Sequence, residues 1–524
     1  MSSILTNNSA MVALQTLKAV NNNLAKTQGE ISTGKSVASA SDNAAVWAIS
    51  KVMESDVQGF KAISDSLALG ESTLAVGKKA AEATTDLLTQ IKGKIVAAQE
   101  ENVDRAKIQT DIEALTNQIK SVVGAAQFNG KNIVNNSDLT SILSSLDRDG
   151  QGNVKSASIE FRGQDLTTKS GTVETANAIN RIGTVADDGT YTVGAGATLS
   201  NVANDATITI ATEVANGDTV TVNFADQQFT YTNNTGIAIA VADFDDILAA
   251  GLANLGVEGV TTSVTGAGEV TISSTNKFES ITIQGSSTGA TTFTVDPDAG
   301  GPQPAAAADA PATLVARAET ISLGGAGNTG GVVNEGDGFR IALDGKTFDY
   351  VARAGDTLND VAQGLKRVID AGQIDGISVK VNLSDDVISS PPTIQIDNDN
   401  ASTVALTVDD GAGGQASGGL VGLDGINVST KDGAEAALSN IETLIQRSID
   451  SAAEFGSVQG RVETQSDFVS KLTDSLKSGI GALVDADMEE ASARLQALQV
   501  QQQLATQSLS IANQAPQQLL ALFR

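Results

Sequence analysis

The chain has 524 residues with no cysteine and no histidine, which excludes disulfides, thiolate or imidazole metal sites and histidine acid–base chemistry. Its net charge of −29 argues against nucleic acid as a partner, because phosphate binding requires clustered lysine and arginine. No apolar run is long enough to span a membrane, and residues 1–33 lack the basic and apolar regions of a cleaved signal peptide.

The N-terminal residues predict a helix from Asn7 or Asn8 to about Ile31, because either asparagine can cap it. Its apolar and amide residues recur at alternating steps of four and three, which is the spacing of a coiled-coil seam. We expect this seam to comprise Ala10, Leu14, Leu17, Asn21, Leu24, Gln28 and Ile31.

Two more helices are predicted after a polar break, from Asp42 to about Gln99 and from Asp104 to about Gly124. The longer one contains four glycines, which each cost about 1 kcal/mol inside a helix, so a break near Gly70 or Gly77 is an alternative. Beyond an Asn-Gly turn at Asn129, we expect a short helical piece over Leu139–Leu146 and then a strand over Ala157–Phe161.

The middle of the chain, from about residue 171 to residue 427, is rich in glycine, threonine, valine and aspartate and has little helical periodicity. It contains a duplication with an offset of 119 residues, in which Gly217-Asp218 and Phe229-Thr-Tyr231 match Gly336-Asp337 and Phe348-Asp-Tyr350. Two copies at this spacing predict two similar α+β modules joined by a linker at residues 297–311. This region carries 32 acidic and 9 basic residues between positions 173 and 426.

Helical periodicity returns after residue 427 and ends in a second seam with steps of three and four. We expect this seam to comprise Leu495, Leu498, Gln502, Ala505, Leu509 and Ala512, with Leu519 and Leu520 beyond it.

The two seams can be buried only against each other. The N-terminal and C-terminal helices must therefore lie side by side, and the chain between them must return to the end where it began. The predicted fold class is therefore mixed: a long antiparallel α-helical coiled-coil stalk from both termini, with two inserted α+β modules. The expected parts are an N-terminal core helix (1–35), the N-terminal half of the helical stalk domain with a β-hairpin (36–172), the first module and its linker (173–312), the second module (313–426), the C-terminal half of the stalk domain (427–488) and a C-terminal core helix (489–524).

Residues 495–524 contain one charge, at Arg524, and many glutamines. Amide side chains can be buried without the cost of dehydrating an ion, so this helix can bury all its faces among neighbours. A lone pair of such helices is marginal in water, and we expect both ends to become ordered on self-assembly. The simpler alternative is one amphipathic helix of a bundle.

Catalytic and metal sites have weak support. Asp147, Asp149, Gln151 and Asn153 resemble a calcium loop, but its twelfth position is Ser158 in place of glutamate, which favours a polar turn. The pairs Asp245-Asp246 and Asp385-Asp386 are interpreted as a helix start and a turn. Asp397-Asn-Asp399-Asn400 is the first place to look for calcium or another ligand, with a solvated loop as the alternative. We therefore predict no catalytic residues, no metal and no cofactor.

Three stretches carry a resemblance to bacterial flagellin: Gly34-Lys-Ser-Val-Ala-Ser-Ala-Ser-Asp-Asn-Ala-Ala45, Gln127-Phe-Asn-Gly-Lys-Asn-Ile133 and Ala512-Asn-Gln-Ala-Pro-Gln-Gln-Leu-Leu-Ala-Leu-Phe-Arg524. With the seams, the resemblance covers residues 1–172 and 427–524. It implies a non-enzymatic, secreted subunit that leaves through the type III export channel and polymerises into the flagellar filament, with its modules on the filament surface.

The resemblance also implies a filament cap, junction proteins and an export chaperone as partners, and neither nucleic acid nor a membrane. Some flagellins carry a Gln-Arg-x-Arg-Glu-Leu run that the innate receptor TLR5 recognises. The corresponding residues here, Thr89-Gln-Ile-Lys-Gly-Lys94, replace its arginine, glutamate and leucine, which puts recognition in doubt. The alternatives are a hook–filament junction protein and a filament subunit whose modules act as an adhesin.

Overall fold

The computed structural model describes residues 7–148, 153–186, 191–194, 196–289, 291–297, 310–324, 332–385 and 390–522, with side chains up to residue 514. The chain forms two compact units. The first unit consists of residues 1–74, 140–161 and 457–524, and the second of residues 75–139 and 162–456.

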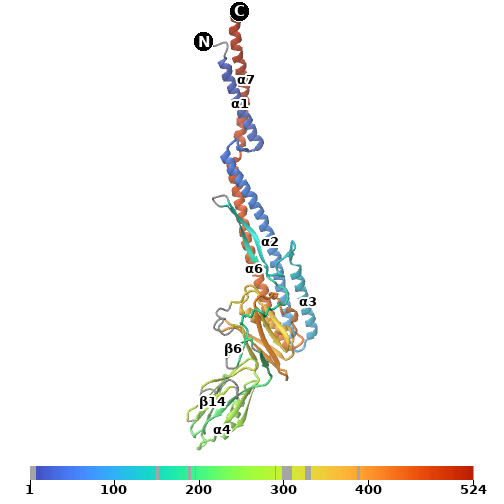
Figure 1. Ribbon diagram of the computed structural model, residues 1–524, viewed down its shortest axis with the longest axis vertical. Helices are drawn as coiled ribbons and strands as arrows, with labels where there is room; N and C mark the ends of the chain where they lie inside the picture. Colours follow the sequence, from blue (N-terminus) through green and yellow to red (C-terminus); the bar gives the residue numbers. More distant parts are fainter. Residues whose placement is uncertain are drawn as a thin grey trace. The chain divides into compact units, whose positions relative to one another are not determined.

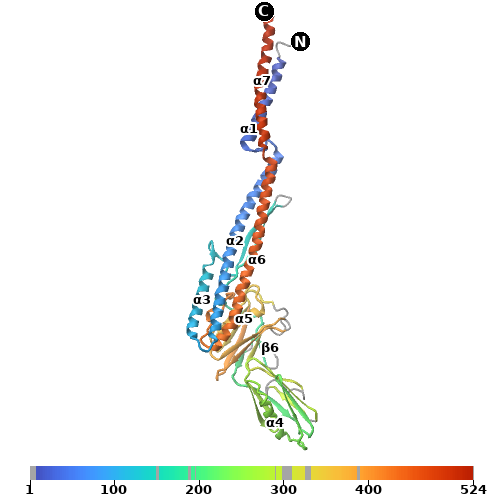
Figure 2. The same cartoon turned by 180° about the vertical axis from the view of Figure 1, so that it is seen from behind.

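The two ends of the chain are helices that lie side by side in the first unit (Figures 1 and 2). Helix α1 spans Asn8–Thr33 and α7 spans Met488–Leu522. The Asn7 side chain caps α1 by accepting a hydrogen bond from the Ala10 N–H at 3.0 Å. Gly34 ends the helix with a φ of 70°, a left-handed conformation that glycine adopts without steric cost. The predicted return of one terminal helix onto the other is confirmed.

The break between α1 and α2 (Ala44–Ala98) is bound to the break between α6 (Lys431–Val484) and α7. The Ser36 N–H donates to the Val484 carbonyl at 2.7 Å, and the Ala486 N–H donates to the Gly34 carbonyl at 3.0 Å. Backbone groups freed where a helix ends need partners, and here each break supplies partners for the other.

Helix α2 is unbroken, so the alternative of a break near Gly70 or Gly77 is wrong. Three of its glycines are covered by apolar side chains. A Cβ atom at Gly59 would lie 2.8 Å from the Leu146 side chain, one at Gly70 would lie 2.4 Å from Ile142, and one at Gly77 would lie 2.6 Å from Ile133. These glycines let the following chain approach the helix closely.

The predicted helical piece over Leu139–Leu146 is wrong, because these residues form a strand. Strand β3 (Leu139–Arg148) pairs with β4 (Val154–Arg162) in a two-stranded sheet. The apolar residues do have helical spacing, but Thr140, Ile142 and Ser144 alternate as the buried side of a strand. Contact with the glycines of α2 and pairing with β4 override the local pattern.

In the second unit, α3 (Arg105–Ala125) lies beside α2 (Figures 1 and 2). Asp104 caps α3 by accepting from the Lys107 N–H, and the Lys94 ammonium of α2 lies 2.5 Å from the Asp111 carboxylate of α3. The predicted Asn-Gly turn at Asn129 joins β1 (Gln127–Phe128) to β2 (Lys131–Asn132).

The first module, residues 204–314, has two four-stranded sheets that share one core with α4 (Val241–Ala253). The first sheet has the order β10-β9-β13-β15, and the second has the order β11-β12-β8-β14. The strands are β8 (Asn204–Ile210), β9 (Thr219–Phe224), β10 (Gln227–Thr232), β11 (Val260–Gly266), β12 (Glu269–Ser274), β13 (Ile281–Ser287), β14 (Phe293–Asp296) and β15 (Ala312–Leu314).

The second module has the same plan, with sheets β18-β17-β21-β7 and β19-β20-β16-β5-β6 around α5 (Leu358–Ala371). A Thr357–Asp360 capping box starts α5. The strands are β5 (Gly183–Val185), β6 (Tyr191–Val193), β7 (Gly196–Leu199), β16 (Glu319–Ser322), β17 (Gly338–Leu343), β18 (Lys346–Val351), β19 (Ile377–Asn382), β20 (Thr393–Asn398) and β21 (Val404–Gly411).

The two modules are nested in sequence. Strands β5 and β7 pair with β16 and β21 of the second module, although our expected boundary placed residues 183–199 in the first. In the first module the equivalent positions are occupied by β14 and β15, which come from the end of that module. The second module therefore takes flanking strands from before the first module, which is inserted within it.

Candidate functional site

The paired terminal helices carry the features that the sequence singled out. On α7 the less exposed side chains are those of Ala491, Leu495, Leu498, Gln502, Ala505, Leu509 and Ala512. The C-terminal seam expected from the sequence thus lies on the side of α7 with the lowest exposure. Leu519 and Leu520 lie on α7 where the side chains are outside the described residues.

On α1 the expected seam is only partly the less exposed side of the helix. At every second position of the seam, the less exposed side chain is that of the preceding residue. Leu17, Leu24 and Ile31 are partly buried, but Leu14, Asn21 and Gln28 are exposed. Ala13, Val20 and Thr27 take their places toward the helix pair. In the described part of the chain α7 is the helix that packs closely against α1. It contacts the row with Ala13, Val20 and Thr27, which neighbours the predicted row on the helix surface.

Two polar contacts join the helices between chain positions nearly 500 residues apart. The Gln502 side-chain amide donates to Asn21 Oδ1 at 2.8 Å, and the Asn7 amide donates to the Ala512 carbonyl at 2.8 Å. An amide pair fixes the register of two helices without placing a charge between them.

Much of the apolar surface of this helix pair remains exposed. Met11, Val12, Val500, Leu504 and Ile511 are each more than half exposed. A groove of about 680 Å³ runs between the helices, and its walls include Val12, Val20 and Leu504. A large exposed apolar surface indicates a protein–protein contact. Residues 495–522 of α7 carry no charge, which allows that contact to be fully buried.

Among the other predicted sites, Asp245 has a structural role. Asp245 is buried and accepts hydrogen bonds from the Gly268 N–H at 2.8 Å and the Asp246 N–H at 2.7 Å, so it holds the turn between β11 and β12. Asp149, Gln151 and Asp386 lie outside the described residues. No group of three or more histidine, cysteine, aspartate or glutamate side chains is placed to bind a metal ion in the described part of the chain.

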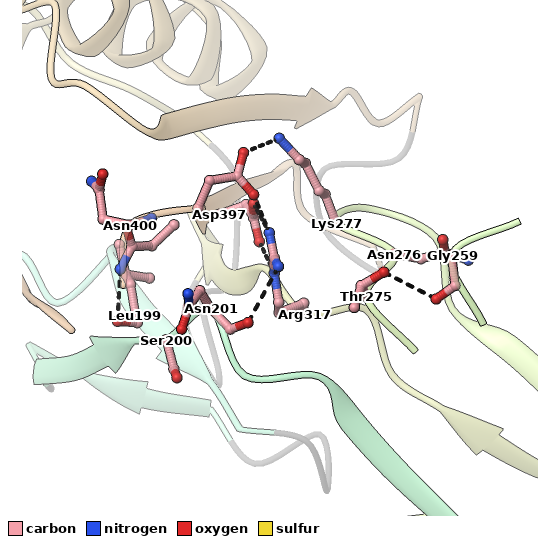
Figure 3. A network of polar contacts seen from close by, with 12 residues as sticks. Leu199, Ser200, Asn201, Gly259, Thr275, Asn276, Lys277, Arg317, Asp397 and Asn400 are labelled. Atoms are coloured by element: carbon pink, nitrogen blue, oxygen red, sulfur yellow. Dashed lines mark hydrogen bonds and ion pairs between the residues drawn. The ribbon is translucent and has the colours of Figure 1, made fainter. Parts of the chain in front are cut away.

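Asp397 and Asp399 belong to an ion-pair network between the two modules. Figure 3 shows Asp397, Arg317 and Lys277 of this network. The Arg317 guanidinium donates to both oxygens of Asp397 at 2.8 and 2.7 Å and to Asp399 at 2.5 Å. Lys277 of the first module also pairs with Asp399. The Arg317 N–H donates to the Asn276 carbonyl at 2.9 Å. We call Arg317, Asp397, Asp399 and Lys277 the module clamp; it takes the place of the expected ligand or solvated loop.

The electrostatics of the module clamp follow from its burial. The side chain of Asp397 is fully buried and that of Arg317 is 8% exposed. Burial raises the pKa of the Asp399 carboxyl, but hydrogen bonds from Lys277 and Arg317 outweigh this effect and hold that pKa below its ordinary value. The same carboxylates raise the pKa of Arg317. The sequence analysis did not identify Arg317, because no local pattern links it to Asp397, which lies 80 positions later in the chain.

No helix among the described residues is long and apolar enough to cross a membrane. Terminal helices with exposed, nearly uncharged apolar faces, at the two ends of a chain that carries β-rich modules between them, define a subunit that assembles with copies of itself.

Comparison with known proteins identifies the family of the chain. Residues 4–138 match the bacterial flagellin N-terminal helical region, and residues 438–523 match the bacterial flagellin C-terminal helical region. Flagellin A of Rhizobium meliloti is 30% identical over 535 residues, and Flagellin A of Rhizobium meliloti strain 1021 is 31% identical over 533 residues. Both alignments cover 100% of each chain. The chain belongs to the flagellin family.

Among solved structures, the flagellar hook-associated protein-3 of Legionella pneumophila is 8% identical to this chain with a TM-score of 0.31, over 83% of this chain and 98% of that one. Membership of the flagellin family makes the chain a structural subunit of the extracellular flagellar filament, with a role in motility.

Proposed function

We propose that this flagellin polymerises through the exposed sides of α1 and α7. The two predicted seams contribute to this assembly in different ways. Leu14, Asn21 and Gln28 of α1 lie on the exposed side and pack against neighbouring copies, and the less exposed seam residues hold the helix pair together: Leu17, Leu24 and Ile31 on α1, and Leu495, Leu498, Gln502 and Leu509 on α7. Leu519 and Leu520 complete the predicted seam of α7. The exposed apolar side chains of the helix pair are the observation that supports this division.

Assembly then completes the burial of the terminal helices. A two-helix pair with exposed Met11, Val12, Leu504 and Ile511 buries too little surface for high stability alone. In a polymer, these side chains are buried against neighbouring copies. Each Å² of apolar surface removed from water in this way stabilises the assembly by roughly 25 cal/mol. Folding of the chain ends and growth of the filament are therefore coupled.

The further partners follow from family likeness. A filament cap, junction proteins and an export chaperone that contacts the C-terminal helix suit a subunit whose ends become ordered on assembly, with export through a type III channel. The proposed role needs no catalytic residue and no cofactor. Recognition by TLR5 is not part of the proposal, because residues 89–94 depart from the recognised run.

Substitution of one exposed leucine tests the proposal. Leu504→Glu places a charge on the α7 surface that the polymer would bury, and we expect it to raise the critical concentration for assembly by at least about tenfold, since burial of a leucine is worth about 1.5–3 kcal/mol. Sedimentation and negative-stain microscopy of purified subunits measure this concentration.

Val202→Glu is the matched control, because Val202 is similarly exposed but lies beside the modules: Leu504 is 61% exposed and Val202 is 67% exposed. This control should assemble like the wild type. Assembly of Leu504→Glu at the wild-type critical concentration would contradict the proposal.

A further inference from the structure

The edges of the described sheets differ in how they are protected from pairing with other strands. An edge strand exposes unpaired N–H and C=O groups, and proteins usually protect it by short length, charge, proline or a bulge. Strands β6, β7, β14 and β15 have three or four residues, and β1 and β2 have two. Strand β11 carries a bulge between Val264 and Gly266, β19 carries Lys380, β18 carries Lys346 and Asp349, and β3 and β4 carry charges of both signs.

Strand β10 has none of these protections. It is an edge strand of six residues, Gln227–Thr232, and pairs with β9 without a register shift. It contains no charge, glycine or proline, and its phenylalanine, threonines and tyrosine favour extended backbone. Among the edges that the structure describes, β10 is the one best suited to accept another strand.

The backbone of β10 presents free groups in register. The Ala225 N–H donates to the Thr282 carbonyl, and the Thr288 N–H donates to the Thr219 carbonyl. Odd-numbered residues of β9 therefore bond to β13, and its even-numbered residues bond to β10. Because bonded pairs alternate along an antiparallel ladder and Val222 lies opposite Phe229, residues 227, 229 and 231 bond to β9. The N–H and C=O groups of Gln228, Thr230 and Thr232 therefore point away from β9, toward the open edge of the sheet.

The side chains beside this edge form a neutral surface. Three rows cross the outer side of the sheet: Gln228–Asn223–Gln284, Thr230–Thr221–Ser286 and Thr232–Thr219. The first module as a whole is strongly acidic, with 13 acidic residues and one basic residue between positions 204 and 314. Two copies of such a module repel each other, and the repulsion at close approach is smallest where the facing surfaces carry no charge.

The second module shows that the fold does not require this neutrality. The row equivalent to Thr230–Thr221–Ser286 is Asp349–Arg340–Asp409. Asp349 and Arg340 lie at the duplication offset of 119 residues, and Asp409 takes the place of Ser286 because it pairs with Arg340. Arg340 forms an ion pair with Asp349 at 2.7 Å. At the end of β18, the Val351 N–H donates to Ser417 Oγ and the Val351 carbonyl accepts from the Ser417 N–H, both at 3.0 Å. The same edge is thus charged and partly covered in one module and neutral and open in the other.

We propose that β10 pairs, edge to edge, with a strand of the first module of a neighbouring copy in the filament. A second copy is the occupant that the charge pattern favours, because the neutral rows allow two acidic modules to approach. The filament holds copies at fixed spacing, so a weak six-residue contact gains from a high effective concentration. The proposal goes beyond polymerisation by the terminal helices and depends on it.

Hydrogen exchange of the full chain tests the proposal. In the dilute monomer the amides of Gln228, Thr230 and Thr232 should exchange freely, and in filaments they should exchange about tenfold or more slowly. The amides of Thr347 and Asp349 on β18 serve as the internal control and should not change on assembly. Filaments in which residues 228, 230 and 232 exchange as in the monomer would overturn the proposal. Slow exchange already in the monomer would also overturn it, because another segment of the same chain would then cover the edge.

A proline variant separates this contact from assembly itself. Thr230→Pro removes an N–H that faces away from β9, which an edge strand tolerates. We expect filaments to form but to dissociate at a lower temperature, with the protection of residues 228 and 232 lost. Thr347→Pro, at an outward position of β18, is the matched control and should behave like the wild type.

The outcomes are distinguishable from failure of the proposed function. If no filaments form from the wild type, the terminal-helix proposal fails first. If wild-type filaments form and Thr230→Pro filaments keep the wild-type dissociation temperature and the same amide protection, the β10 contact alone is refuted.

Discussion

Single glycines in α2 decide where the following chain packs. Gly70 lies under the side chain of Ile142, and a Cβ atom there would lie within 3 Å of three Ile142 atoms. Gly93 lies in the same helix with nothing within 4 Å of its Cβ position. One residue type thus has two roles in one helix: at Gly70 it permits a close approach, and at Gly93 it only lowers the helix propensity.

Alanine substitutions at these two glycines should have opposite effects. Gly93→Ala should raise the free energy of unfolding by about 0.5–1 kcal/mol, because alanine favours the helix. Gly70→Ala should lower it by about 1–3 kcal/mol, because the buried Ile142 has to move. Chemical denaturation of the monomer measures both. An increase in stability for Gly70→Ala would show that the hairpin can shift at no cost.

Arg317 is the residue on which the module clamp depends. Its loss leaves the fully buried Asp397 carboxylate without a cation. We expect Arg317→Met to destabilise the modules by about 3–5 kcal/mol, as removal of one partner from a buried pair does. Arg340→Met is the control, since its pair with Asp349 is partly exposed and should contribute about 1 kcal/mol or less. Equal effects of the two substitutions would argue against the clamp.

The module clamp also predicts a pH dependence. The pKa of Asp399 is lower in the folded chain than its ordinary value, so the folded state binds a proton less readily than the unfolded state. The stability from this group is therefore present above about pH 4 and is lost as the pH falls through the folded-state pKa. Thermal melts of the wild type and of Arg317→Met between neutral pH and pH 3 should converge, and parallel curves would count against the network.

At the scale of elements, helix α1 has two neighbouring rows of apolar residues that differ in exposure. Val20 is 8% exposed and faces the helix pair, whereas Leu14 is 46% exposed. The sequence spacing fits either row, because the two stripes are shifted by one residue in alternate turns.

Substitutions at these two positions should separate pairing within the chain from assembly. Val20→Ala should lower the helicity and stability of the chain ends in the monomer by about 1–2 kcal/mol. Leu14→Ala should leave the monomer unchanged and raise the critical concentration for assembly. Circular dichroism of dilute monomer and sedimentation of filaments provide the two measurements. A loss of monomer helicity in Leu14→Ala as large as in Val20→Ala would place both rows in the same contact.

At the scale of the whole molecule, the nested modules have unequal independence. The first module is built from one continuous segment, residues 204–314, whereas the second needs strands from both sides of that segment. The chain leaves the second module after Leu199 and returns at Glu319, and side-chain contacts such as Asn204 to the Val315 carbonyl at 3.2 Å join the two connections.

Deletion of the first module should therefore spare the rest. Replacement of residues 204–314 by a short glycine–serine linker should leave the second module folded and filaments able to form, because β5 and β7 remain in the chain. Microscopy and a thermal melt check both points. Deletion of residues 183–314 is the comparison. We expect it to unfold the second module, because both sheets of that module lose strands. If both deletions behave alike, the nested arrangement is incorrect.

The sequence by itself determined the features that are encoded locally or by repetition. Heptad steps identified both terminal helices, asparagine and aspartate marked the starts of α1 and α3, and the constant offset of 119 residues revealed two similar modules. Such patterns are readable because the residues that make them are neighbours in the chain or copies of one another.

Only the tertiary structure decided which partners those patterns meet. Leu139–Leu146 has helical spacing but forms a strand, because it lies over Gly59 and Gly70 and pairs with β4. Strands β5 and β7 belong to a module that continues more than 100 residues later, and Arg317 pairs with Asp397 across the module boundary. Each of these choices depends on contacts between residues far apart in sequence, whose free energy outweighs the local preference.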